Sequence, residues 1–197
     1  MRREGQERDM SLFLPPKSEL RDYQRQALDS LYDWFRQGNQ GNPCLVLPTG
    51  AGKSHVIAAL CQEAVQQWNS RLLMLTHVRE LISQNAEKLR SHWPNAPLGI
   101  YSAGLRRREL GRAITFAGIQ SVRKRAADIG RVDLVVIDEC HLVSHRDTGG
   151  YRSLLNDLRE INPKLRVIGL TATPYRLGHG VITDDPAIFD ALMSRSA

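Results

Sequence analysis

The sequence lacks two features that would place it in or across a membrane. Its charged first ten residues, MRREGQERDM, are followed by no apolar segment of the kind found in secretion signals. No later apolar run approaches the roughly 20 residues that a helix needs to span a bilayer. We therefore expect a soluble protein that is not secreted, that acts in the cytoplasm and that has no membrane partner.

Cysteine is scarce as well. The three cysteines, Cys44, Cys61 and Cys140, stand far apart and form no CxxC pair. A zinc site or a dithiol redox centre needs closely spaced cysteines, so neither is expected. We interpret all three as buried or bystander thiols.

The length and the charge set further bounds. A chain of 197 residues with 42% hydrophobic residues suits one compact domain, or one domain followed by the beginning of a second. The formal net charge is +6, which favours a polyanionic partner without identifying it.

Short apolar strands alternate with amphipathic helical stretches along the chain. Nearly continuous apolar strands joined by helices are typical of a parallel sheet that is covered on both faces. The expected strands lie in CLVLP, RLLMLTH, PLGIYSA, AITFAGI, VDLVVIDE and RVIGLTAT, and the expected helices over 54–68, 78–92, 120–128 and 150–160. The sequence therefore predicts a three-layer α/β domain with a mainly parallel central sheet.

The two ends of the chain differ from this pattern. Residues 1–19 are expected to form a mobile arm, because they are polar and end in a Pro15-Pro16 pair that blocks helix propagation. The domain is expected over 20–180. Within 181–197, Asp185 as N-cap and Pro186 at the first helical position predict a helix. This segment is either a terminal helix of the domain or the start of a second lobe.

The string TGAGKS lies in a short turn between an apolar strand and a helical stretch. The expected strand runs from Leu45 to Leu47 and the helix begins near Lys53, so backbone N–H groups and the positive helix end point at one anion. Lys53 can reach the β and γ phosphates of a nucleotide, and the Ser54 hydroxyl can bind Mg²⁺. The string therefore predicts a loop that binds a nucleoside triphosphate with Mg²⁺.

One residue departs from the full P-loop pattern, because Leu47 stands where that pattern has its first glycine. The prediction therefore depends on TGAGKS itself, whose glycines let the backbone approach phosphate closely. Dinucleotide binding is excluded, because GxGxxG would need a glycine at His55. The predicted ATP-binding residues of the loop are Thr49, Gly50, Ala51, Gly52, Lys53 and Ser54.

Two acids, Asp138 and Glu139, close an apolar strand in the run LVVIDECH. Carboxylates at the end of a buried strand are costly unless they hold a cation or move a proton. We expect Asp138, together with Ser54, to hold Mg²⁺, and Glu139 to take a proton from the attacking water. The sequence has no NKxD string of a GTPase and no LSGGQ-like string of a transporter ATPase.

With TGAGKS and DECH, the chain resembles the first RecA-like lobe of superfamily 2 helicases of the DEAD/DEAH-like (DExH) group. The resemblance covers about Leu20 to Gly178. It implies a RecA-like P-loop NTPase fold, ATP and Mg²⁺ as cofactors, and ATP hydrolysis in which His141 acts beside Glu139.

Further strings of the same family follow in order along the chain. The string LRDYQ at 20–24 resembles the Q motif, in which Gln24 would pair with adenine and thereby select ATP over GTP. Arg21 and Tyr23 would support the base, although Tyr23 is equally well explained as a core residue. TATPYR at 171–176 resembles motif III, in which Thr171 and Thr173 would couple the carboxylate site to the nucleic acid.

Two strings resemble the motifs that contact the sugar-phosphate backbone of one nucleic-acid strand. They are THVRELISQ at 76–84, which resembles motif Ia, and FAGIQSV at 116–122, which resembles motif Ib. The candidate contact residues are His77, Arg79, Gly118, Gln120 and Ser121. Basic clusters in GLRRREL at 104–110 and at 123–125 can line the same path, but no single role is assigned to them.

The resemblance implies single-stranded or branched nucleic acid as the partner, with DNA favoured over RNA. At a finer level the strings LPTGAGKS, HVRELISQN, SAGLRRRE, VIDECH and GLTATPYRLGHG resemble RadD-type bacterial DNA repair ATPases. A second RecA-like lobe, which supplies arginines to the γ-phosphate, is expected as a further partner. Without it, this lobe should hydrolyse ATP poorly and unwind nothing. The alternatives are a nucleotide-gated nucleic-acid-binding module and the motor subunit of a restriction-type enzyme.

Overall fold

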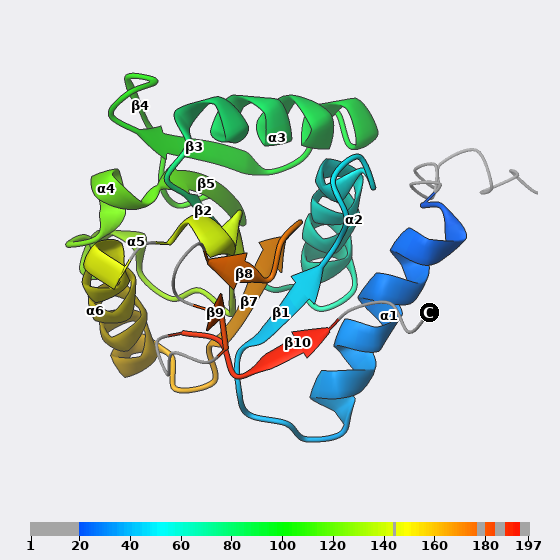
Figure 1. Cartoon of the computed structure of the whole chain (residues 1–197). Helices are drawn as coiled ribbons and strands as arrows, with labels where there is room; N and C mark the ends of the chain where they lie inside the picture. The colour runs from blue at the N-terminus through cyan, green and yellow to red at the C-terminus, as the bar shows by residue number, and fades with distance from the viewer. Residues whose placement is uncertain (1–19, 144, 177–179, 184–187, 194–197) are drawn as a thin grey trace, which may run out of the picture.

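A computed structural model describes residues 20–143, 145–176, 180–183 and 188–193. Figure 1 shows a central sheet with helices packed on both of its faces. The described strands form an eight-stranded sheet in the order β10-β1-β7-β6-β2-β5-β3-β4. Every neighbouring pair in it is parallel except β3 with β4. The predicted three-layer α/β fold with a mainly parallel sheet is therefore confirmed.

A strand is present in every apolar segment that was expected to hold one. The strands of the large sheet are β1 (Pro43–Val46), β2 (Leu72–Thr76), β3 (Leu98–Ser102), β4 (Arg107–Arg108), β5 (Ile114–Gly118), β6 (Leu134–Asp138), β7 (Arg166–Thr171) and β10 (Ala191–Met193), and β8 (Tyr175–Arg176) pairs with β9 (Gly180–Val181) in a separate ribbon. The α-helices are α1 (Asp22–Arg36), α2 (Lys53–Gln66), α3 (Arg79–His92), α4 (Ile119–Val122), α5 (Ala126–Ile129) and α6 (His145–Ile161). None of the helices in these described ranges is long and apolar enough to cross a membrane.

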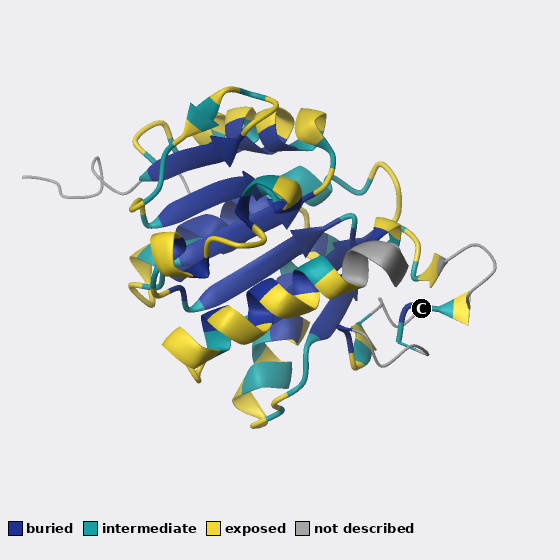
Figure 2. Cartoon of the chain, turned by 90° about the vertical axis from the view of Figure 1, so that its left-hand side faces the viewer, coloured by how far each residue is buried: buried dark blue, intermediate teal, exposed yellow. Residues whose placement is uncertain are grey.

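Both faces of the sheet are buried, which explains why the strands are apolar without alternation. Leu72 and Met74 of β2 pack in the core beneath α1, α2 and α3, whereas Leu73 and Leu75 pack in the core beneath α4, α5 and α6. Figure 2 shows the strands in the colour of buried residues between helices whose outer faces are exposed. The three cysteines are buried and form no disulfide among the described residues, and the sulfur atoms of Cys44 and Cys140 lie 3.4 Å apart.

The helix expected over 120–128 is divided in two. The structure has α4 and α5 instead, because Arg125 adopts φ −128° and ψ 30° between them and breaks the helical path. The helix expected over 150–160 is present but starts earlier, since α6 begins at His145.

The expectation of a terminal helix is wrong for the described part of that segment. Asp185 and Pro186, its expected start, lie outside the described residues, as does the expected arm over 1–19. Ala191–Met193 instead form β10, which pairs in parallel with β1. The outer edge of β1 would otherwise present unpaired backbone groups, so tertiary pairing outweighs the helical spacing of the apolar residues. This part of the chain therefore completes the sheet of the same domain.

The parallel strands bring the expected motifs to one edge of the sheet. Carboxyl ends of parallel strands meet at the same edge, which is where ligands bind in open α/β sheets. The TGAGKS loop follows β1, Asp138 ends β6, and Thr171 ends β7. Motifs Ia and Ib lie at the ends of β2 and β5, of which β2 is next to β6 and β5 is next to β2 in the sheet.

Candidate active site

The TGAGKS loop links β1 to the first residue of α2. Gly50 and Gly52 both have positive φ, at 79° and 72°, a conformation that glycine adopts at little cost. Gly52 is the N-cap of α2, so the loop lies at the N-terminus of this helix. The unpaired N–H groups and the positive end of the helix dipole therefore point toward the loop. This is the strand, turn and helix arrangement that the sequence predicted, and it can hold a phosphate group.

Lys53 and Glu139 meet across the sheet edge. The ammonium of Lys53 forms an ion pair and hydrogen bond with Oε1 of Glu139. Both side chains are largely buried, with 16% and 20% exposed, so water screens the pair only in part. The pair joins the first residue of α2 to the residue that follows β6, although they are far apart in the sequence. A nucleotide phosphate on the loop would compete with Glu139 for Lys53.

Asp138 is the buried carboxylate of the site, at 2% exposed. Its Oδ2 accepts a hydrogen bond from Nδ2 of Asn85 at 2.9 Å, and its Oδ1 accepts one from the Glu139 N–H at 2.9 Å. Burial raises the pKa of Asp138 above its ordinary value, and the positive charge of Lys53 opposes this. A carboxylate removed from water in this way gains strongly from a nearby cation.

The donor set around Asp138 fits Mg²⁺ better than a metal held entirely by protein. No group of three or more histidine, cysteine or acidic side chains within the described residues can hold a metal ion. Mg²⁺ usually keeps several waters and binds through one or two protein oxygens together with substrate phosphates. Asp138 and Ser54, expected from the sequence, are oxygen donors of that kind.

Asn85 is a site residue that the sequence analysis missed. It lies in α3 and is only 4% exposed. Its neighbours on the helix, Ile82, Ala86 and Leu89, are buried apolar residues. An amide among apolar residues on the buried face of a helix was the available signal, because a buried polar group needs a partner. That partner is Asp138.

Glu139 is held by contacts on two sides. It adopts the left-handed conformation with φ 50°, which costs a non-glycine residue on the order of 1–2 kcal/mol. Besides Lys53, its Oε2 lies 3.3 Å from Nδ1 of His141. The Nδ1 atom of His141 is also 2.7 Å from Oγ1 of Thr171. Backbone strain of this kind persists where surrounding contacts hold it in place.

The hydrogen bonds of Thr171 indicate the tautomer of His141. The Thr171 hydroxyl donates to the carbonyl of Thr173 at 2.8 Å, so its single proton is used and it accepts from His141. We therefore assign the ring proton of His141 to Nδ1. Burial lowers the pKa of His141, although Glu139 raises it, which favours the neutral ring. The structure thus brings Glu139, His141, Thr171 and Thr173 together in one chain of contacts.

Gln24 lies at the loop but its amide is already engaged. Its Nε2 donates to the carbonyl of Ala51 at 2.7 Å, and its Oε1 accepts from the N–H of Arg21 at 2.9 Å. The hydroxyl of Tyr23 donates to the same Ala51 carbonyl at 3.0 Å. One N–H and one oxygen lone pair of the amide stay free, but Gln24 is only 4% exposed, so a base can reach its amide only after the loop shifts. Arg21 is exposed at the start of α1.

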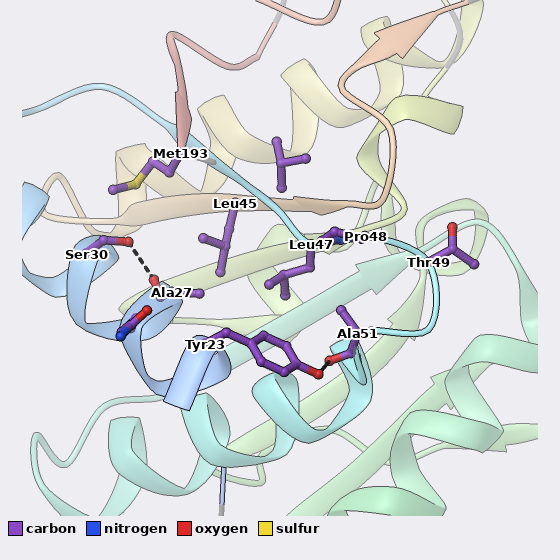
Figure 3. A pocket seen from close by; sticks show the side chains of 11 residues that line it. Tyr23, Ala27, Ser30, Leu45, Leu47, Pro48, Thr49, Ala51 and Met193 are labelled. Atoms are coloured by element: carbon purple, nitrogen blue, oxygen red, sulfur yellow. Dashed lines mark hydrogen bonds between the residues drawn. The ribbon is translucent and has the colours of Figure 1, made fainter. Parts of the chain in front are cut away.

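A pocket of about 510 Å³ opens beside the loop, between α1, β1 and β10 (Figure 3). Its wall is mostly apolar, and the ring of Tyr23 lies between α1 and the loop. The lining residues are Tyr23, Gln26, Ala27, Ser30, Leu45, Val46, Leu47, Pro48, Thr49, Ala51 and Met193. This volume is large enough for a nucleobase with its sugar. Of the three residues expected at the base, only Tyr23 lines this pocket.

The expected nucleic-acid contacts gather at the ends of β2 and β5. These strands pair in parallel with Thr76 opposite Gly118, so motifs Ia and Ib begin side by side. His77, Arg79 and Gln120 are exposed there. Exposed cationic and polar side chains beside the N-terminus of α3 can contact a phosphate backbone without reading its bases.

The turn after β3 joins these two motifs. Ser121 Oγ accepts a hydrogen bond from the N–H of Ala103 at 3.0 Å. A Cβ atom on Gly104 would lie 2.9 Å from Cδ of Arg79, so the turn packs directly against that side chain. Arg79 itself pairs with Glu80 at 3.0 Å, and both side chains are well exposed. Such an exposed pair contributes little to stability, which leaves Arg79 available for phosphate.

The chain is similar in sequence to one family model and to several curated proteins. Residues 17–176 match the family model described as type III restriction enzyme, res subunit. IRC3 of Saccharomyces cerevisiae is 30% identical over 168 residues, which cover 78% of this chain and 23% of that protein. DNA 3'-5' translocase XPB2 of Sulfurisphaera tokodaii is 32% identical over 165 residues, which cover 83% of this chain and 33% of that protein. The chain thus spans a third or less of the length of these two relatives.

A solved structure supports the fold. The UvsW helicase from bacteriophage T4 superposes with a TM-score of 0.68 at 20% sequence identity, covering 90% of this chain and 60% of that chain. At that identity the likeness concerns the fold, which in both molecules is a RecA-like α/β domain.

Proposed function

We propose that this chain, which belongs to the family described as type III restriction enzyme, res subunit, is the ATP-binding lobe of a helicase or translocase that acts on DNA. It forms the first RecA-like lobe of a DExH-type superfamily 2 helicase. One observation carries this proposal. The ion pair of Lys53 with Glu139 joins the phosphate loop to the carboxylates at the end of β6. Phosphate-binding, metal-binding and base groups therefore converge at one point.

Each residue of this site has a proposed role. Backbone N–H groups of the loop and the ammonium of Lys53 bind the phosphates of ATP. Ser54 and Asp138 would hold Mg²⁺, which when bound neutralises charge on the β and γ phosphates. Glu139 accepts a proton from the attacking water once Lys53 has moved to phosphate. His141 orients Glu139 and links it to Thr171.

A second RecA-like lobe is part of the proposal. The resemblance assigns the arginines that reach the γ-phosphate to that lobe, and such an arginine is typically worth about 10³ to 10⁵ in rate. The small share of its relatives that this chain covers, 23% and 33%, supports this division. This chain of 197 residues alone is therefore expected to bind ATP with Mg²⁺ weakly, to hydrolyse it poorly and to separate no strands.

DNA is proposed as the nucleic acid, with RNA disfavoured. The basis is that the relative XPB2 is a DNA translocase by name; the exposed backbone contacts by themselves suit a single strand of either kind. A motor subunit of a restriction-type enzyme is the second candidate, which the description of the family favours. Both candidates use the same ATP site. The finer resemblance to RadD-type ATPases stays a prediction.

We expect this chain to prefer ATP over GTP, and Gln24→Ala to narrow that preference. The reason is that the Gln24 amide, once released from Ala51, can pair with adenine through two hydrogen bonds, which discriminate by about 1–3 kcal/mol. Calorimetric titration with each nucleotide and Mg²⁺ measures the ratio, which should fall by about 5- to 100-fold. Gln66→Ala, an exposed change at the end of α2, is the control. An unchanged ratio in Gln24→Ala would assign base selection to other residues.

Arg79→Ala should weaken binding of single-stranded DNA and reduce its dependence on salt. The slope of log K against log salt concentration is negative, and removing one cation that neutralises a phosphate is expected to reduce its magnitude by about 0.7. Fluorescence anisotropy with a labelled oligonucleotide over a series of salt concentrations measures this slope. Lys164→Ala removes an exposed charge just before β7, at the other end of the strands, and should leave the slope as it is. The same slope in Arg79→Ala and the wild type would exclude Arg79 from the contact.

A further inference from the structure

A second pocket lies at the opposite end of the sheet from the phosphate loop. Its volume is about 330 Å³. Leu134 and Arg166, which line it, are the first residues of β6 and β7, so it opens at the amino ends of the strands. Strands of five or six residues separate the two sites by roughly 16–20 Å. Nothing in the proposed function uses this pocket.

Aromatic side chains form one wall of it. Tyr32 and Phe35 come from α1, and Trp68 follows the end of α2. The rings of Tyr32 and Trp68 meet edge to face with centroids 4.9 Å apart. Trp68 is nevertheless 47% exposed. A large ring that is held in place and still faces solvent is the kind of residue that dominates binding energy at protein interfaces.

A guanidinium without an acidic partner lies beside this wall. Arg166 stacks over the ring of Phe35, with its central carbon 5.2 Å from the ring centroid. It donates only to neutral oxygens, the carbonyl of Asn39 and Oε1 of Gln40, each at 3.2 Å. Among the described residues no carboxylate pairs with it. Stacking holds the planar fork of the guanidinium in a fixed orientation, which suits a carboxylate that approaches from outside.

The other charges of the pocket are already paired. Arg36 bonds to Asp33 at 2.9 Å. Asp133 accepts from the backbone N–H of Arg71 at 2.9 Å and from the side chain of Arg131 at 3.1 Å. The net charge that remains unpaired at the pocket is therefore positive. The formal net charge of the whole chain, +6, also attracts an approaching anionic segment.

We propose that this aromatic pocket, formed by Tyr32, Phe35, Trp68 and Arg166 over a floor of Leu60 and Ile168, binds a short acidic segment of a partner protein. An aromatic or branched apolar side chain of that segment fills the pocket, and a neighbouring carboxylate pairs with Arg166. The volume suits one such side chain rather than a nucleotide cofactor. A nucleic-acid backbone is disfavoured, because it needs a row of cations and, in the described part of the chain, only two cationic residues, Arg36 and Arg166, line the pocket.

Fluorescence polarisation with defined peptides tests the proposal on the whole chain. The probe is a labelled decapeptide rich in aspartate and glutamate with one central phenylalanine. We expect saturable binding, weakened about tenfold or more when the phenylalanine is replaced by alanine or the acids by lysines. Trp68→Ala and Arg166→Gln should each weaken binding of the original peptide to a similar extent. Lys124→Gln, an exposed charge near α5, controls for general attraction and should change little.

Three results would overturn the proposal. One is the absence of saturation up to about 1 mM peptide, and another is binding that Trp68→Ala leaves unchanged. The third is a dimer in sedimentation experiments that Trp68→Ala dissociates, since the occupant would then be a second copy of this chain. ATP titration of the same variants should match the wild type, which shows that they are folded. Should Arg166→Gln fold poorly, Trp68→Ala and the altered peptides decide the outcome.

Discussion

Lys53→Ala is expected to lower the affinity for ATP with Mg²⁺ by about 100-fold or more. Lys53 is the cation of the phosphate loop, and each charge-assisted hydrogen bond that it makes to phosphate is worth about 1.5–3 kcal/mol. Two such hydrogen bonds account for the expected decrease. Isothermal titration calorimetry of the wild type and the variant measures it, and equal affinities would remove the assignment of TGAGKS as the phosphate loop.

Glu139→Gln is the matched comparison, because it breaks the same ion pair from the other side. Glu139 holds Lys53 in the structure and competes with phosphate, so its neutral isostere should bind ATP as well as the wild type or better. In a two-lobe protein the same variant should stop turnover, since an amide cannot take the proton of the attacking water. If both variants bound ATP equally poorly, the cause would be the broken ion pair and not the absence of a cation at the phosphates.

Gly169→Ala is expected to lower the free energy of unfolding by about 1–3 kcal/mol or more. Gly169 lies on β7, paired with Cys44 of β1 on one side and Ile137 of β6 on the other. A Cβ atom there would lie 2.6 Å from Cε1 of Phe189 and 2.9 Å from Sγ of Cys140. Phe189 is 2% exposed, so neither neighbour can give way without disturbing the core.

Urea denaturation followed by circular dichroism measures this effect through the midpoint of unfolding. Gly149→Ala is the control, because a Cβ atom on Gly149 of α6 would meet nothing within 4 Å. Alanine is the better helix former there, so this change should stabilise the chain by up to about 1 kcal/mol. A Gly169→Ala protein with the midpoint of the wild type would mean that the core around Phe189 is loosely packed.

The sequence was sufficient for features that depend on neighbouring residues. Apolar runs of strand length predicted the strands from β1 to β7, with the exception of the two-residue β4. The string TGAGKS predicted the turn between β1 and α2, since the positive φ of Gly50 and Gly52 is a local requirement of that turn. The place of Asp138 at the end of β6, followed by Glu139, was also predicted from neighbouring residues. The roles proposed for the two acids stay predictions, which rest on the cost of burying a carboxylate.

Features that depend on distant residues were decided by the tertiary structure alone. Gln24 is hydrogen-bonded to Ala51, and Asp138 to Asn85. The aromatic pocket is likewise lined by residues from several distant segments. No local sequence pattern connects these segments. The helical spacing near the C-terminus was overruled because the open edge of β1 offered backbone hydrogen bonds to Ala191–Met193. Periodicity determines which face of a segment is apolar, whereas only the packing of the sheet determines which partners meet that face.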